Sequence, residues 1–236
     1  MKIYKVGGAV RDSLMGVKSS DRDWVVVGSS PEEMVSNGFK PIGKDFPVFL
    51  HPETNEEYAL ARTEKKTGTG YGGFTFYYGK DVTLEEDLSR RDFTINAIAQ
   101  DDSGVIIDPF NGQDDIKNKL FRHVSDAFFE DPLRAIRLAR FFSYDHLKDF
   151  DIDASTIECI EKIVSSREIA DISSDRIWSE TERALSNSNP SKYFEKIISL
   201  NLLDPYFIKL TKSYCDSHND KTCLLYTSDA ADETGR

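Results

Sequence analysis

The chain has 236 residues, of which 39% are hydrophobic and 30% are charged, and this composition is typical of a water-soluble protein with one large or two modest domains. It has no apolar run of membrane-spanning length, no secretory signal and no paired cysteines, so we expect a cytoplasmic protein without a membrane partner, a disulfide framework or a thiolate zinc site. The formal net charge of −11 is unusual for a nucleic-acid-binding protein, but it leaves room for a local basic groove.

The first 125 residues mix short strand-like runs with helical segments. The strand-like runs are β-branched or aromatic between turn residues, and they read KIYKV, DWVVV, FPVFL, EEYALA, TINAIAQ and GVIIDP. The helical segments read AVRDSLMG, which Gly16 closes, PEEMVSNG, which Ser30 caps and Gly38 ends, and QDDIKNKL. The segment Lys65–Lys80 is rich in glycine, aromatic residues and lysine, and it predicts a flexible surface loop. This mixture predicts an α+β domain over residues 1–125.

From Asp126 onward the strand-like runs disappear. EDPLRAIRLARFF, STIECIEKIVSS, SDRIWSETERAL and PSKYFEKIISLNLL are amphipathic at helical spacing, so they predict an all-helical second domain over residues 126–222. We expect SDRIWSETERAL to support this domain, with Trp178 in its core. Residues 223–236 differ abruptly from the rest, and we interpret them as a non-native tail; without their three acids and one base the net charge changes from −11 to −9.

Asp21 and Asp23 are separated by one residue at the start of the run DWVVV. Because strand side chains alternate, both carboxylates project on the same face. Two adjacent carboxylates repel each other unless a cation lies between them, and Mg²⁺ prefers such oxygen ligands and shares them with substrate phosphates. A surface turn or a helix cap is the alternative. Upstream, however, VGGAVRD places a glycine turn and Arg11 where they would attract phosphate, so the pair suits a two-metal centre for phosphoryl transfer.

Five motifs follow one another along the chain, namely VGGAVRD, DRDWVVVG, RRDFTINAIA, EDPLRAIRLARF and SDRIWSETERAL. In this order and at these spacings they resemble class II CCA-adding tRNA nucleotidyltransferases of the poly(A) polymerase superfamily. DFPVFLHPETNEEYALARTEKKTG further resembles the N-terminal half of the enterobacterial multifunctional form. The resemblance covers residues 1 to about 205. It implies a DNA-polymerase-β-like nucleotidyltransferase head followed by an all-helical neck and partial body, the latter serving base recognition and tRNA binding.

The resemblance also implies an activity, which is the template-independent addition of C, C and A to the 3′ end of tRNA from CTP and ATP, with release of pyrophosphate. It implies that Asp21 and Asp23 are the catalytic residues and hold Mg²⁺. Glu57 is a candidate third metal ligand on a neighbouring strand, and Glu56 competes for that place. A bacterial poly(A) polymerase, which would use ATP alone, and a non-catalytic nucleotide-binding or RNA-binding module are the alternatives.

Base selection has a simple chemical basis. A carboxylate that accepts from an exocyclic amine, beside a guanidinium that donates to a ring nitrogen, would accept cytosine and adenine and reject uracil and guanine. Asp131 and Arg134 fit that pattern, as the resemblance implies. A solvated basic stripe on an ordinary amphipathic helix is the alternative, and Arg91 could likewise pair with nearby acids on the surface. The residues that the resemblance places on the nucleotide are Gly8, Arg11, Arg91, Asp131, Arg134, Arg137 and Arg140.

Overall fold

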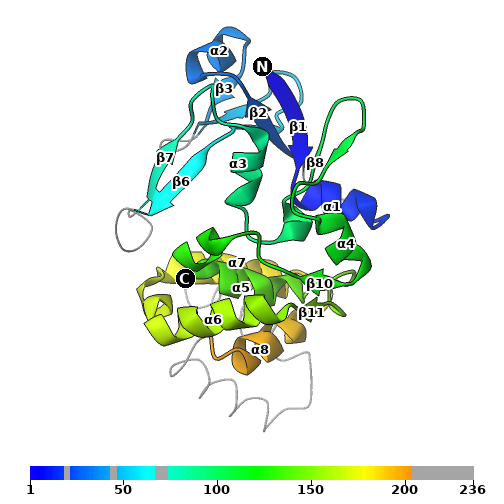
Figure 1. The fold of residues 1–236 in the computed structure, drawn as a ribbon, viewed down its shortest axis with the longest axis vertical. Coiled ribbons are helices and arrows are strands. Elements are labelled where there is room, and N and C mark those ends of the chain that lie inside the picture. Colours follow the sequence, from blue (N-terminus) through cyan, green and yellow to red (C-terminus); the bar gives the residue numbers. More distant parts are fainter. Residues whose placement is uncertain (19–21, 43–46, 67–73, 203–236) are drawn as a thin grey trace, which may run out of the picture. The chain divides into compact units, whose positions relative to one another are not determined.

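The computed structural model describes residues 1–18, 22–42, 47–66 and 74–202 (Figure 1). The chain divides into two compact units, and the first comprises Met1–Asp131 and Phe150–Cys159, while the second comprises Pro132–Asp149 and Ile160–Arg236. Three sequence-based predictions, those for Asp21, for the centre of the glycine-rich segment and for the tail, lie outside the described residues. Among the described residues, no helix has the length and hydropathy that crossing a lipid bilayer requires.

The first unit is built on a seven-stranded mixed sheet (Figure 1). In spatial order its strands are β3 (Lys40–Pro41), β4 (Val48–Leu50), β5 (Glu57–Leu60), β2 (Asp23–Val27), β1 (Lys2–Val6), β8 (Ala99–Gln100) and β9 (Ile106–Ile107). The runs KIYKV and DWVVV are confirmed as strands over their full length. β2 pairs antiparallel with β1 and in parallel with β5, so it lies in the interior of the sheet.

The α-helices that lie wholly within the first unit are α1 (Gly8–Leu14), α2 (Pro31–Ser36), α3 (Leu84–Ser89) and α4 (Gly112–Lys117). Ser30 caps α2, because its hydroxyl accepts a hydrogen bond from the backbone N–H of Glu33 at 3.4 Å. Gly38 follows α2 in the left-handed region, with a φ of 87°. Both predicted helix signals are thus confirmed. α3 begins with a capping box, in which the side chains of Thr83 and Glu86 accept from each other's backbone N–H.

The two faces of the sheet pack against different helices. Val26 of β2 is buried in a cluster with Met34 of α2. Its neighbour Val25 points to the other side, into a cluster with Leu88 of α3. Because side chains alternate along a strand, Asp23 lies on the same face as Val25. The predicted carboxylate site is therefore on the side of the sheet that α3 covers.

The glycine-rich segment differs from its prediction as a loop. Its two flanks form a two-stranded antiparallel sheet of β6 (Thr63–Lys66) and β7 (Phe74–Tyr77). The aromatic and threonine residues of FTFY favour a strand, and pairing with β6 gives their backbone groups partners. Only residues 67–73, between the two strands, remain outside the described part of the chain.

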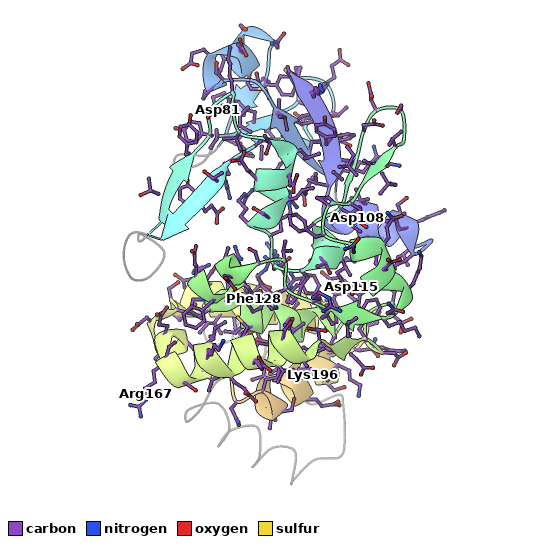
Figure 2. All side chains as sticks on the ribbon, in the orientation of Figure 1. Asp81, Asp108, Asp115, Phe128, Arg167 and Lys196 are labelled. Carbon is purple, nitrogen blue, oxygen red and sulfur yellow. The ribbon has the colours of Figure 1, made fainter. Side chains whose placement is uncertain are left out.

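The run TINAIAQ was expected to be one strand, but it begins as a 3₁₀ turn at Thr94–Asn96 and becomes β8 only at its end. Two side-chain hydrogen bonds explain the difference. Thr94 Oγ1 donates to Asp115 Oδ2 at 2.6 Å, and Asn96 Nδ2 donates to Asp92 Oδ1 at 3.0 Å. Asp115 lies on α4 (Figure 2). Side-chain bonds of this kind compete with a strand ladder.

One strand lies beyond Asp126, where none was expected. β11 (Asp151–Ile152) pairs in parallel with β10 (Leu120–Phe121), and this pairing returns the chain to the first unit. Two residues with one aspartate give no alternating pattern, so the sequence carries no strand signal there. A short 3₁₀ helix, Asp126–Glu130, precedes the second unit.

The regular elements of the second unit, among its described residues, are helices. Its helices are α5 (Leu133–Phe141), the later part of α6 (Ala154–Ser166), a 3₁₀ turn (Glu168–Asp171), α7 (Ser174–Leu185) and α8 (Pro190–Ser199). α5 packs against both α7 and α8. The four predicted helices are thereby confirmed, and with the mixed sheet of the first unit they confirm the predicted α+β fold class.

The expectation that Trp178 lies in the core is wrong, because 55% of this residue is exposed. The buried positions of α7 are Glu180, Thr181 and Ala184, which share one side of the helix. Trp178 lies off that side. On α7 the buried position is therefore occupied by Glu180, whereas the sequence pattern predicted Trp178 there.

Candidate active site

Asp23 and Glu57 lie side by side at the start of two neighbouring strands. They are directly opposite each other in the parallel pairing of β2 with β5, so their side chains share one face of the sheet. Both residues are exposed. Neither carboxylate has a hydrogen bond or an ion pair with any residue that the structure describes. The structure thus brings Asp23 and Glu57 together.

Glu56, the competitor of Glu57, is engaged elsewhere. It accepts from Trp24 Nε1 at 2.9 Å and from Arg22 Nη1 at 3.2 Å. Trp24 stacks on Tyr58, with ring centroids 5.4 Å apart, on the opposite side of the strands from Asp23. The two adjacent glutamates therefore face different environments, and Glu57 is the one beside Asp23.

This carboxylate pair has the chemistry of a divalent-cation site. Two carboxylates held together without a cationic partner repel each other, and hard cations such as Mg²⁺ prefer such oxygen donors. Asp23 and Glu57 therefore fit such an ion, while Asp21 is outside the described residues. Within the described ranges, no group of three or more histidine, cysteine, aspartate or glutamate side chains is arranged to hold a metal.

Gly7 is the point on which the site converges. It has a φ of 72° and a ψ of −142°, a backbone conformation that residues other than glycine rarely adopt. A Cβ atom on Gly7 would lie 3.0 Å from Arg91 Nη1 and 3.7 Å from Asp23 Oδ2. The bare backbone of Gly7 thus lets a guanidinium and a carboxylate approach the same place. The next residue, Gly8, begins α1 and is half-buried.

Arg91 reaches this place from the residues that follow α3. Its side chain is 18% exposed, and its Nη2 donates to Asp87 Oδ2 at a long 3.4 Å. Its Nε is buried and has no hydrogen-bond partner among the described residues. An arginine with unused donors beside an open backbone suits an anionic ligand.

Arg11 lies close to the same turn, but its guanidinium is engaged by the protein. Its side chain is only 4% exposed and pairs with Asp12, and its Nη1 donates to Asn96 Oδ1 at 2.7 Å. Asn96 in turn donates to Asp92. Sequence reasoning did not find Asn96, because its run was read as a regular strand, in which a buried amide has no evident partner.

Arg90 and Arg91 have different surroundings although they are adjacent. Arg90 donates to Asp87 Oδ1 through Nε and Nη2, and to Glu64 Oε1 through Nη1 at 2.7 Å. Arg62 also pairs with Glu64, at 3.1 Å. Burial alone would raise the pKa of the Asp87 carboxyl, but the charges of Arg90 and Arg91 outweigh burial and hold that pKa below its ordinary value.

The base-reading candidates fall in both units. Asp131 ends the first segment of the first unit, and Arg134 lies in the first turn of α5 in the second. Arg134 is 9% exposed, whereas the side chain of Arg137 is 33% exposed. The alternative interpretation, a solvated basic stripe on α5, therefore does not hold for Arg134, while Arg137 remains accessible.

Arg140 is held inside the second unit. It is 5% exposed, and its Nε forms a close ion pair with Glu180 of α7. Its Nη1 donates to Tyr144 at 2.7 Å, and its guanidinium lies 4.6 Å from the ring centroid of Phe141. These contacts give Arg140 a structural role in joining α5 to α7. Its predicted contact with nucleotide finds no support in this geometry.

Comparisons with known proteins show which family the chain resembles. The family described as "Poly A polymerase head domain" matches residues 3–122, and "Probable RNA and SrmB- binding site of polymerase A" matches residues 149–213. The chain is 58% identical to a CCA-adding enzyme of Coxiella burnetii over 194 aligned residues. This alignment covers 82% of this chain and 51% of the relative.

Two solved structures share the fold. One is the Bacillus stearothermophilus CCA-adding enzyme in complex with CTP, which has a TM-score of 0.70 and a sequence identity of 31%. The match covers 86% of this chain and 49% of the Bacillus chain. The other is the Thermotoga maritima CCA-adding enzyme complexed with tRNA, which has a TM-score of 0.66 and a sequence identity of 28%. That match covers 85% of this chain and 47% of the Thermotoga chain. The chain spans about half the length of these relatives. The chain therefore belongs to the family of proteins that carry the poly A polymerase head domain.

Proposed function

We propose that the protein adds C, C and A to the 3′ end of tRNA, using CTP and ATP. One observation carries the proposal. Asp23 and Arg91 converge on the bare backbone of Gly7, in a chain that is 58% identical over 194 residues to a CCA-adding enzyme. The similar structures with CTP and with tRNA support the same substrates.

In this proposal Asp21 and Asp23 hold Mg²⁺, and Glu57 is the third carboxylate. The exposed Asp23–Glu57 pair, without a cationic partner among the described residues, supports this choice over Glu56. When bound, the metal would lower the pKa of the attacking hydroxyl and neutralise charge on the triphosphate.

The other residues bind and orient the nucleotide. Arg91 donates to the triphosphate beside Gly7, while Gly8, at the start of α1, contacts a phosphate. Arg11, which is held by Asp12 and Asn96, fixes the shape of this turn and is not the main phosphate ligand.

Asp131 and Arg134 select cytosine and adenine through the amine and ring-nitrogen pattern, and a mismatched base would leave their polar groups unpaired. Arg137, which is partly exposed, holds the nucleotide or the tRNA end.

The reaction itself is a displacement at phosphorus. The 3′-oxygen of tRNA attacks the α-phosphorus of CTP or ATP, so that a new P–O bond forms, the bond to the bridging oxygen breaks, and pyrophosphate leaves with that electron pair. The hydroxyl proton passes to solvent. Positioning of the two substrates supplies most of the acceleration that such a site can give.

The test is nucleotide addition by the 236-residue chain to tRNA that lacks its 3′ end, with Mg²⁺ and with the four nucleoside triphosphates offered singly and together. We expect two C and one A. Asp23→Asn should abolish the reaction, whereas Asp102→Asn, which changes an exposed acid on a turn, should leave it unchanged.

Other outcomes would contradict the proposal. Runs of A alone would indicate a poly(A) polymerase. No incorporation by the folded wild-type chain at saturating tRNA would leave a nucleotide-binding or RNA-binding module.

A further inference from the structure

Two adjacent arginines differ sharply in how many of their donors are used. Arg90 reaches three acceptors, namely Asp87, Glu64 and the backbone carbonyl of Arg62. Arg91 has a single long contact, with Asp87, and a buried Nε without an acceptor among the described residues. Among the described residues, Asp87 is therefore the side-chain partner that can fix the direction of Arg91.

Asp87 is the residue that links the two arginines. Its side chain is fully buried, and it divides its oxygens, with Oδ1 on Arg90 and Oδ2 on Arg91. Oδ1 also accepts from the backbone N–H of Arg62 at 3.2 Å. The carboxylate is therefore held on one side by Arg90 and by the backbone of Arg62, just before β6, and it presents its second oxygen to Arg91.

The charges in this cluster do not cancel. Arg62, Glu64, Asp87, Arg90 and Arg91 carry three positive and two negative charges, so the cluster sums to +1. Arg91 is the member that lies over Gly7, at the place where Asp23 also points. A largely buried surplus of positive charge favours an anionic ligand beside it, and Arg91 is the member that presents this charge at the place where a triphosphate would lie.

We propose that Asp87 is a positioning residue, which holds the guanidinium of Arg91 over Gly7 for the triphosphate of the incoming nucleotide. The inference rests on the proposed function. Asp87 itself is too deeply buried to touch the substrate. Glu64 holds Arg90 and Arg62 but makes no contact with Arg91, so it belongs to the same cluster without the same task.

The difference between these two acids gives a matched experiment on the full 236-residue chain. Asp87→Asn and Glu64→Gln each remove one negative charge from the cluster and preserve side-chain shape. For each variant, the dissociation constant of CTP with Mg²⁺ is measured without tRNA, KM and kcat for CTP are measured in the addition assay, and the unfolding temperature is recorded.

We expect Asp87→Asn to raise the dissociation constant and the KM of CTP by about tenfold, with kcat changed by less than about twofold, because ground state and transition state lose the same contact. Glu64→Gln should lower the unfolding temperature but leave CTP binding as in the wild type. Asp87→Glu, which restores the charge one methylene further out, should lie between the wild type and Asp87→Asn.

The possible results separate this inference from the proposed function. If the wild-type chain binds CTP and both neutral variants bind it equally well, the positioning role is overturned and the proposed function stands. If the wild-type chain does not bind CTP, both are overturned. Should Asp87→Asn fail to fold, Asp87→Glu decides, because a KM equal to that of the wild type would overturn the role and a raised KM would support it.

Discussion

At the scale of single residues, Gly7 shows how one missing side chain shapes the site. Two glycines of the first unit share a φ of 72°, Gly7 at the start of α1 and Gly16 just after its end. They differ in what surrounds them, since a Cβ on Gly7 would approach Arg91 and Asp23, whereas no neighbouring atom of the described residues lies within 4 Å of a Cβ on Gly16. Comparing substitutions at Gly7 and Gly16 can therefore separate the effect of backbone strain from the effect of crowding Arg91 and Asp23.

We expect Gly7→Ala and Gly16→Ala both to destabilise the protein, each by about 1 kcal/mol or more, because alanine is strained at this φ. Only Gly7→Ala should also weaken CTP binding, since its methyl group would displace Arg91 Nη1, which lies 3.0 Å from that position. Chemical unfolding and equilibrium binding measure the two effects. Equal CTP affinity in the two variants would contradict the close approach at Gly7.

The sequence names candidate residues of the site but not all of their partners. Asp23 and Arg91 could be named because each belongs to a recognisable motif. Asn96, which accepts from Arg11, could not. The acids near Arg91 were expected as surface partners, whereas Asp87 is buried. Their partners depend on how α3 and the 3₁₀ turn at Thr94–Asn96 pack against the sheet, and no local pattern encodes that packing.

At the scale of elements, helix ends were predicted well because capping is a local property. α2 begins after Ser30 and ends before Gly38 as expected, because a helix cap and a glycine in the left-handed region act within one turn. The buried side of α7 was predicted poorly. Trp178 is exposed, whereas Glu180 is buried beside a cationic partner on another helix, which offsets the cost of burying an acid.

The contact between α5 and α7 therefore depends on a buried ion pair. The side chains of Arg140 and Glu180 are both 6% exposed, and Arg137 approaches the same carboxylate at 3.7 Å. Removing the charge of Glu180 would leave Arg140 buried without its counter-ion. The loss falls on the second unit, since both helices belong to it.

We predict that Glu180→Gln lowers the stability of the second unit by about 3 kcal/mol, the range typical of breaking a buried ion pair. Glu182→Gln, on an exposed position of the same helix, should change it by less than about 0.5 kcal/mol. Urea unfolding followed by circular dichroism measures both. If Glu180→Gln proved as mild as Glu182→Gln, Arg140 would not depend on this pair, and its predicted contact with nucleotide would regain interest.

At the scale of the whole molecule, the chain crosses between its two units more than once. The sequence predicted one boundary after residue 125, whereas the structure ends the first segment at Asp131 and returns Phe150–Cys159 to the first unit. This return rests on β11, where the Asp151 amide donates to the Lys119 carbonyl at 2.8 Å. A two-residue strand carries no sequence signal, so the return could only be seen in three dimensions.

Glu180→Gln also tests whether the two units open separately. If they do, amide hydrogen exchange should accelerate by about 100-fold in the second unit, as 3 kcal/mol implies, and should not change in the first. The Asn189 amide, which donates to the Ser143 carbonyl at 3.0 Å, reports on the second unit. The Asp151 amide reports on the first unit. In the sequence this residue lies between the two segments that form the second unit. Equal acceleration at both amides would show that the units unfold together, and that the return of the chain through β11 ties their stabilities to each other.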